Sequence, residues 1–155
     1  MKELCLIMQN IGLNNAKSYL NSGNLLFDSR GDTDFEEKLI SKAILSTFGV
    51  NTLVLIFSQQ RIHRIFKENP YNTTTHPPSL IHTVFVKDES RLKHLKPNIK
   101  TEDLYHIGSK AIYIFTPRGY HKTKINNLFW EKQLNTPTTA RNLNTVAKLI
   151  QMTHD

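Results

Sequence analysis

The apolar positions in the first part of the chain follow helical and strand-like spacings in turn. Residues 16–20 and 24–28, joined by an asparagine-serine-glycine turn, predict a β-hairpin. A capping box at residues 33–36 predicts the start of a second helix. The apolar run TLVLIF at residues 52–57 is short enough to be a buried strand, and Ser58 can cap a third helix behind it. A first helix ahead of the hairpin is predicted by an amphipathic stripe followed by Gly12: Leu4, Ile7, Met8 and Ile11.

A polar, proline-containing stretch at residues 69–79 separates these elements from a second set. Beyond it the pattern predicts a strand, a short basic helix, a hairpin and two closing helices: residues 80–87, 88–95, 102–108 with 110–117, 122–134, and 141 to about 152. Helices packed on mostly antiparallel strands make an α+β protein. We expect one domain of two halves, residues 1–70 and 80–155, with residues 71–79 as the connecting loop.

Composition and charge narrow the classes of function. The 155 residues carry a formal net charge of +7, which favours polyanionic partners such as nucleic acid but is also common among ordinary basic proteins. The single cysteine, Cys5, excludes an intramolecular disulfide. No apolar run approaches the roughly 18 residues of a membrane span, and the first residues lack the features of a signal peptide. We therefore expect a cytoplasmic protein without membrane association.

The sequence contains no recognisable motif for a metal or a cofactor. No two of the seven histidines are four residues apart, and no paired cysteines could complete a zinc site. The glycine-rich phosphate loops of nucleotide-binding proteins are absent, as is the nucleophile motif G-x-S-x-G. We expect neither a metal nor a cofactor, and the residues alone identify no reaction.

The stretch TTARNLNTVAKL at residues 138–149 gathers polar residues at a predicted helix start. Asparagine and threonine are poor helix-interior residues, so they either cap the helix or contact a partner. Thr138 or Thr139 is well placed as the N-cap. The stripe predicted to face the core contains Leu143, Val146, Ala147 and Ile150, and the opposite side carries Arg141, Thr145 and Lys148. Because the helix dipole disfavours a cation on the first turn, Arg141 would need a compensating acid or a bound anion.

Two interpretations of this region remain open. In the first, Glu131 hydrogen-bonds Lys124 or Asn127 on the preceding helix, and the threonines and Asn142 cap and join two packed helices. In the second, polar side chains and free helix-start amides converge on an anionic or amide-bearing ligand. The candidate ligand site of this second interpretation contains Lys124, Asn127, Thr139, Arg141 and Asn142.

Two other segments offer candidate binding groups. Residues 22–24 form a turn in which glycine permits positive φ, and the side chains of Ser22 and Asn24 could also contact a ligand. The second half combines basic residues with aromatic side chains, as single-stranded nucleic-acid sites do. These residues are Lys87, Arg91, Lys93, Lys96, Lys100, Lys110, Arg118 and Lys122, with Tyr105, Tyr113 and Phe115. Nucleic-acid binding is therefore the alternative to a small anionic ligand.

The sequence resembles the bacterial family called domain of unknown function 1697. The hairpin matches the family's tyrosine-x-x-serine-glycine-asparagine motif at Tyr19, Ser22, Gly23 and Asn24. A second motif matches near the C-terminus at Lys124, Asn127, Glu131, Thr139, Arg141, Asn142, Asn144 and Thr145. The resemblance runs from Met1 to about Met152. It implies a ferredoxin-like N-terminal half fused to a second small α/β half, and it implies no reaction, since the family's activity is unknown.

The sequence departs from the family's pattern in two places. Leu143 stands where the family usually has tryptophan. The family also opens with a strand and a glycine-rich loop, whereas this sequence begins within the first helix. Because that strand is central in a βαββαβ half, its absence would leave strand edges unpaired. We expect the coding sequence directly upstream of Met1 to encode the strand and the loop in frame.

Overall fold

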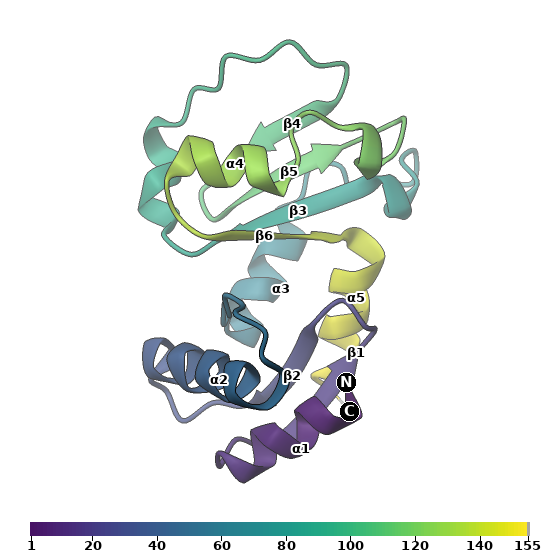
Figure 1. The fold of residues 1–155 in the computed structure, drawn as a ribbon. Helices are drawn as coiled ribbons and strands as arrows, with labels where there is room; N and C mark the ends of the chain where they lie inside the picture. The colour runs from purple at the N-terminus through teal and green to yellow at the C-terminus, as the bar shows by residue number, and fades with distance from the viewer. Residues whose placement is uncertain (155) are drawn as a thin grey trace. The chain divides into compact units, whose positions relative to one another are not determined.

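The computed structural model describes residues 1–154, which form two compact units, Met1–Ile56 and a second unit that begins at Phe57. Each unit combines helices with antiparallel strands, so the predicted α+β class is confirmed (Figure 1). The boundary precedes the predicted connecting loop at residues 71–79, because the third helix packs within the second unit. No helix in the described residues has the length and apolar character needed to cross a bilayer.

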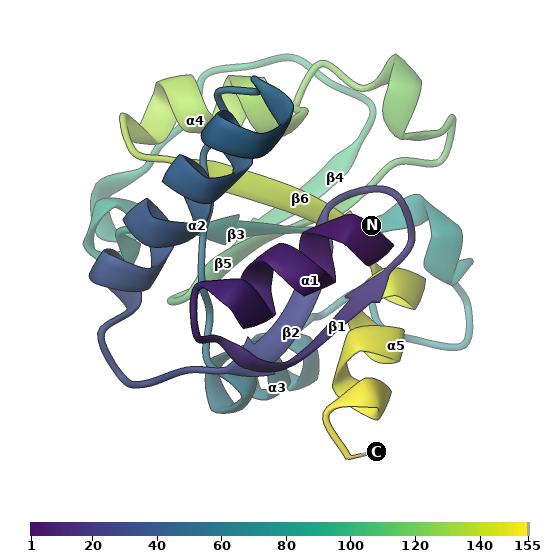
Figure 2. The same cartoon turned by 60° about the horizontal axis from the view of Figure 1, so that its bottom comes forward.

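The first unit consists of two helices and one hairpin. Its elements are α1 (Lys2–Asn10), β1 (Asn14–Tyr19), β2 (Asn24–Asp28) and α2 (Thr33–Phe48). The predicted hairpin is confirmed, with β1 antiparallel to β2, and α1 lies across it in Figure 2. The carboxylate of Asp32, one residue before the predicted capping box, caps α2 by accepting a 3.0 Å hydrogen bond from the Phe35 amide. Met8, Leu13 and Ile40 form the small buried core of this unit.

The apolar run at residues 52–57 does not form the predicted strand, since it belongs to neither sheet. Side chains of α2 bind its backbone instead. The Ser41 hydroxyl donates to the Thr52 carbonyl at 2.6 Å, and the Glu37 carboxylate accepts from the Ile56 amide at 2.8 Å. Val54 and Ile56 pack on the core of the unit, whereas Leu53 is 64% exposed. The run was apolar enough for a strand but lacks a neighbouring strand with which to pair.

The second unit is built on a four-stranded antiparallel sheet of order β4-β5-β3-β6. Its longer elements are α3 (Gln59–Lys67), β3 (Ile81–Val86), β4 (Leu104–Ile107), β5 (Ala111–Phe115), α4 (Asn127–Leu134), β6 (Thr138–Asn142) and α5 (Leu143–Met152). Short 3₁₀ helices lie at Pro78–Leu80, Glu89–His94 and Tyr120–Lys122. The predicted hairpin of β4 and β5 is confirmed, as is the Ser58 cap on α3.

Successive apolar residues of β3 and β5 point to opposite faces of this sheet, so both faces are apolar. Helices cover each face. On one face, Val84, Ile112 and Ile114 pack against Trp130 of α4 and the neighbouring Ile125. The residues of the opposite face meet α3 and α5: Phe85, Ala111 and Tyr113 pack with Ile65 and Val146. Figure 1 shows α4 on one side of the sheet and α3 and α5 on the other. The result is a three-layer unit with two separate apolar cores.

The segment predicted to open the last helix is instead the edge strand β6. Its residues pair with β3 along their whole length, from Thr138 opposite Val86 to Asn142 opposite His82. Threonine is favoured in strands, and β6 supplies hydrogen bonds that the edge of β3 would otherwise lack. The predicted caps at Thr138 and Thr139 are therefore wrong.

The limits and faces of the closing helices also differ from the prediction. Asn142 caps α5 by accepting a 2.9 Å hydrogen bond from the Thr145 amide. Thr145 is buried and Ala147 is exposed, the reverse of the predicted faces. The preceding helix begins only at Asn127, where Asn126 is its cap.

Candidate anion-binding site

The strand register brings two loops together at one end of the sheet. Leu104, the first residue of β4, lies opposite Phe115, the last residue of β5. The residues just before β4 therefore adjoin the residues just after β5. Between these loops lies an open cavity of about 340 Å³, lined by Lys100, Thr101, Glu102, Asp103, Arg118, Lys122 and Lys124.

Cations outnumber acids in this cavity by four to two. Arg118 and Glu102 form an ion pair of 3.1 Å between exposed side chains. Lys100, Lys122 and Lys124 are exposed, and none of their three ammonium groups has an ion pair or hydrogen bond among residues 1–154. Like charges held close together without acids repel one another, so an anion that enters the cavity relieves this repulsion.

One hydrogen bond between the two loops, and others within each loop, hold the residues beside the cavity in place. The buried hydroxyl of Thr123 donates to Asp103 Oδ2 at 2.5 Å and accepts from the Ile125 amide at 3.1 Å. Thr101 Oγ1 donates to the same Asp103 oxygen at 3.3 Å and accepts from the Asp103 amide at 3.1 Å. These bonds fix the backbone on both sides of the cavity, while the lysine side chains remain free to adjust.

Of the residues predicted for a small-ligand site, only Lys124 lines this cavity, and Lys100, Arg118 and Lys122 come from the basic set predicted for nucleic acid. Asn127 faces the sheet, where its side-chain amide donates to the Thr138 carbonyl at 3.2 Å and accepts from the Thr138 hydroxyl at 2.8 Å. Glu131 accepts from the Thr138 amide at 3.0 Å. Glu131 therefore contacts Thr138 rather than Lys124 or Asn127, and both helix residues attach α4 to β6.

The remaining predicted residues of this region lie on different faces of β6, because side chains alternate along a strand. Thr138 faces α4, so Thr139 and Arg141 lie on the opposite face. The Arg141 guanidinium donates to Thr139 Oγ1 at 2.7 Å and to the Ala140 carbonyl at 2.8 Å, and burial lowers its pKa. Since Arg141 is on a strand, the helix-dipole argument does not apply to it. The structure thus does not bring Lys124 and Arg141 to one face.

The two predicted residues of the first unit support their own turn. Asn24 is buried, and its amide donates to Ser22 Oγ at 2.8 Å and to the Tyr19 carbonyl at 3.1 Å. Gly23 between them has φ of 80°, the left-handed conformation that glycine adopts without strain. These contacts account for the serine, the glycine and the asparagine of the hairpin motif.

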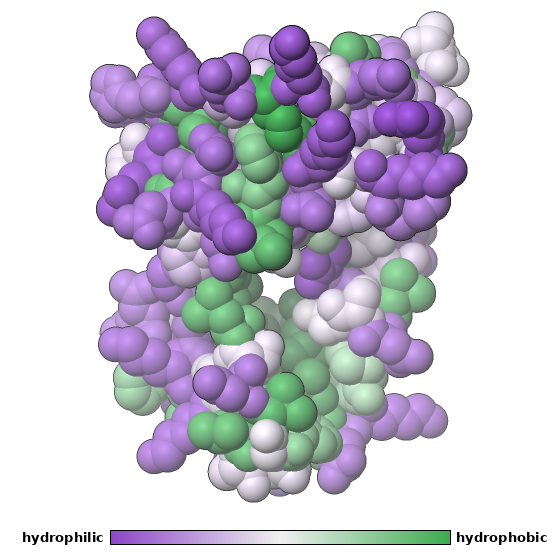
Figure 3. All heavy atoms as spheres, turned by 45° about the horizontal axis from the view of Figure 1, so that its top comes forward, coloured by the Kyte–Doolittle hydropathy of each residue, from purple (hydrophilic) through white to green (hydrophobic). Residues whose placement is uncertain are grey.

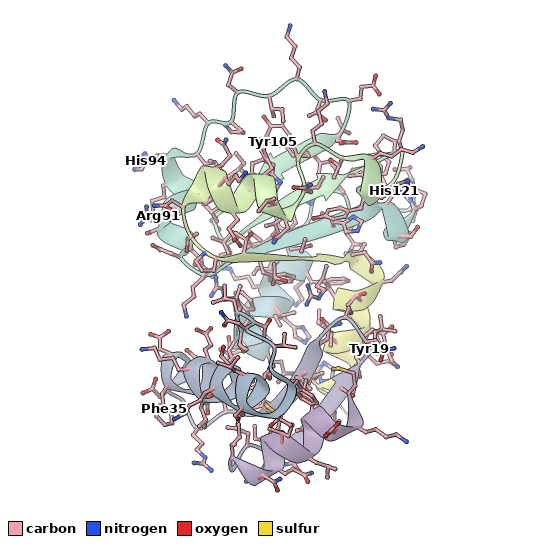
Figure 4. All side chains as sticks on the ribbon, in the orientation of Figure 1. Tyr19, Phe35, Arg91, His94, Tyr105 and His121 are labelled. Atoms are coloured by element: carbon pink, nitrogen blue, oxygen red, sulfur yellow. The ribbon has the colours of Figure 1, made fainter. Side chains whose placement is uncertain are left out.

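The aromatic residues proposed for base stacking have partners within the protein. Tyr113 is 1% exposed, and its hydroxyl donates to the Ile65 carbonyl at 2.9 Å. Tyr105, which is labelled in Figure 4, packs edge-on against Trp130, with ring centres 5.4 Å apart. Phe115 packs in the same manner on His76 at 4.4 Å. Tyr113 is therefore not accessible to a base, whereas Tyr105 and Phe115 are half-buried and each already contacts another ring.

Sequence reasoning missed a stacked pair on the α4 face of the sheet. The rings of His82 and Tyr120 are nearly parallel, 4.3 Å apart and 28° from coplanar. Burial lowers the His82 pKa to about 4 and raises the pKa of Tyr120. The Tyr120 hydroxyl also accepts a 2.8 Å hydrogen bond from the Asn127 amide. No local pattern marks this pair, because the two residues are far apart in sequence.

Histidine, cysteine and acidic side chains form no cluster of three suited to a metal ion within the described part of the chain. The groups that the structure does bring together are mainly cations. The cavity between the loops before β4 and after β5 is therefore defined by its positive charge rather than by any ligand-binding motif.

Two comparisons place the chain among known proteins. The model of the family described as "Protein of unknown function (DUF1697)" matches residues 1–113. The chain belongs to this family. The C-terminal motif from Lys124 to Thr145 lies beyond the residues that the DUF1697 model matches. None of the curated proteins matches the sequence.

A solved structure resembles the whole chain. It is described as the conserved bacterial protein SP0830 from Streptococcus pneumoniae, with a TM-score of 0.72 and 19% sequence identity. The match covers 100% of this chain and 89% of that chain. At this identity the likeness shows the fold alone. Function in this DUF1697 protein therefore has to follow from the chemistry of its own residues.

Proposed function

We propose that the second unit binds a small anionic ligand in the cavity between the loops before β4 and after β5. The observation that carries this proposal is the convergence of Lys100, Arg118, Lys122 and Lys124 on one cavity of about 340 Å³. Three of these cations have no acid partner within the described residues. A volume of this size is at the lower end of the range of small-molecule sites.

The expected affinity for a simple anion is modest. Exposed ion pairs contribute about 0.2–1 kcal/mol each, because water and salt screen them. Four such contacts, less the cost of immobilising flexible side chains, correspond to a dissociation constant of about a millimolar at best and roughly tens of millimolar or weaker otherwise. Tighter binding would require interactions other than ion pairs, such as hydrogen bonds to a fixed acceptor.

The experiment is a titration of the isotope-labelled protein with inorganic phosphate, followed by NMR. We expect phosphate to shift the amides of residues 100–103 and 122–124, and a variant with Lys122→Gln and Lys124→Gln to weaken binding about tenfold. A variant with Lys93→Gln and Lys96→Gln is the matched control, because it removes the same charge from exposed positions outside the cavity. Equal weakening in the two variants would refute a defined site.

Nucleic-acid binding is tested by the same pair of variants. Hydrophilic side chains cover much of the second unit's visible face in Figure 3, and exposed Lys93 and Lys96 extend the charge beyond the cavity. If RNA or DNA binds there, both variants should weaken binding to every sequence alike, with a steep dependence on salt. A flat salt response, or no binding at low salt, favours the small ligand.

We also propose a cytoplasmic location for this activity. The single cysteine supports it, because small secreted domains usually depend on disulfides. Fractionation of cells that express the full-length protein tests this proposal.

A further inference from the structure

The cavity also contains two acids, whose presence needs an explanation in an anion site. Glu102 and Asp103 line it beside the four cations. A carboxylate repels an anion and accepts hydrogen bonds only, so these residues oppose the binding of a plain phosphate or sulfate. They favour a ligand that carries hydrogen-bond donors together with its negative charge.

Asp103 is the better placed of the two acceptors. Its Oδ2 accepts from the hydroxyls of Thr123 and Thr101, which fixes the plane of the carboxylate. Its Oδ1 has no hydrogen-bond partner among residues 1–154. An acceptor held rigidly with one free oxygen gives directional recognition of a hydroxyl group, because little side-chain entropy is lost on binding.

Glu102 is an exposed acceptor that a ligand can reach. Its side chain and that of Arg118 are 75% and 62% exposed, so the ion pair between them is weak. A phosphate that takes Arg118 frees the Glu102 carboxylate to accept a hydroxyl from the same ligand. The pair thus exchanges an internal contact for two contacts with the ligand.

The size of the cavity agrees with a ligand larger than phosphate. The cavity of about 340 Å³ is open to solvent and its volume is at the lower end of the range of small-molecule sites. Inorganic phosphate would leave most of this space to water. A phosphate ester with a short chain or ring of hydroxylated carbons would fill it.

We propose that the ligand is a phosphorylated polyol, such as a sugar phosphate. The phosphate contacts the cations Lys100, Arg118, Lys122 and Lys124, and the hydroxyl groups donate to Asp103 Oδ1 and Glu102. This assignment rests on the proposed anion-binding function. The assignment adds the chemical class of the ligand, which the two acids select.

The test compares three probes by NMR titration: inorganic phosphate, methyl phosphate and ribose 5-phosphate. Methyl phosphate is the control for a phosphate monoester without hydroxyl groups. We expect ribose 5-phosphate to bind the wild type about tenfold more tightly than methyl phosphate, as hydrogen bonds to charged groups would provide. Equal affinities for these two esters would overturn the polyol assignment and leave anion binding intact.

Two variants locate the source of the preference. Asp103→Asn should reduce the preference for ribose 5-phosphate to about threefold or less, and Glu102→Gln should do the same while strengthening methyl phosphate binding. Glu102 is exposed, so its variant tests the idea even if Asp103→Asn perturbs the fold. An unchanged preference in the folded variants would refute the role of the acids. Failure of all three probes to bind the wild type would refute anion binding itself.

Discussion

His82→Phe tests whether the fold holds this imidazole in its neutral form. The ring of His82 is stacked on Tyr120, and burial lowers its pKa from 6.5 to about 4, although a hydrogen bond with the Leu80 backbone acts in the opposite direction. A histidine with a lower pKa in the folded protein binds its proton first in the unfolded chain. The stability of the second unit should therefore be complete above pH 6.5 and fall as the pH drops toward 4.

The size of the effect follows from the two pKa values. A shift from 6.5 to about 4 corresponds to about 3 kcal/mol for a fully buried group. Because His82 is partly exposed, screening by solvent reduces this figure to about 1–2 kcal/mol. Phenylalanine keeps a flat ring against Tyr120 and cannot be protonated, so the variant should lose this part of the pH dependence.

Urea unfolding at several pH values measures the effect. Trp130 is the single tryptophan and is fully buried in the second unit, so its fluorescence reports on that unit. We expect the free energy of unfolding of the wild type to fall by about 1–2 kcal/mol more than that of His82→Phe between about pH 7 and pH 4.5. His82→Gln, which cannot be protonated in this range either, controls for changes in packing. Parallel pH curves for the wild type and both variants would refute the reasoning.

Three further predictions concern the polar contacts within each unit. Glu37→Ala leaves the Ile56 amide unsatisfied, so we expect the free energy of unfolding to fall by about 1–3 kcal/mol and the Ile56 amide to exchange its hydrogen faster. Glu37→Gln should keep this amide protected from exchange. Unchanged exchange in the alanine variant would contradict the prediction. Asn127→Ala removes two contacts with Thr138 and should lower stability by about 1–3 kcal/mol in urea unfolding, with Asn127→Asp as the control that keeps the acceptor. Arg141→Ala should lower stability by about 1 kcal/mol but leave phosphate stabilisation unchanged in thermal melts, because Arg141 does not line the cavity. Loss of the phosphate effect in that variant would count against the proposed site.

The spacing of residues correctly predicted the elements that are stabilised by interactions between residues close in sequence. The hairpin of β1 and β2 has a glycine turn and strand-like flanks, and Ser58 accepts from the Arg61 amide as an N-cap should. In these cases the interactions that matter lie within a few residues. The sequence pattern alone therefore contains enough information.

The missed features depend on residues far apart in the chain. Thr138–Asn142 forms a strand because the edge of β3 is there to pair with it, and Thr138 binds Asn127 and Glu131 of α4 instead of capping a helix. The candidate cavity was not predicted as a site, although Lys124 was a candidate ligand residue and Lys100, Arg118 and Lys122 were assigned to the nucleic-acid alternative, because the β4–β5 register brings its two loops together. Two stretches separated by a hairpin give no local signal of their proximity.

The run at residues 52–57 has a consequence for the protein's behaviour at high concentration. Six residues without a charge, a glycine or a proline, outside any sheet, have the composition of segments that stack into cross-β fibrils. Two contacts from α2, through Ser41 and Glu37, hold this run in the folded protein. The net charge of +7 keeps molecules apart, and this repulsion weakens as salt rises. Solubility should therefore decline with ionic strength, and a charged side chain in place of exposed Leu53 should act as a gatekeeper that restores it.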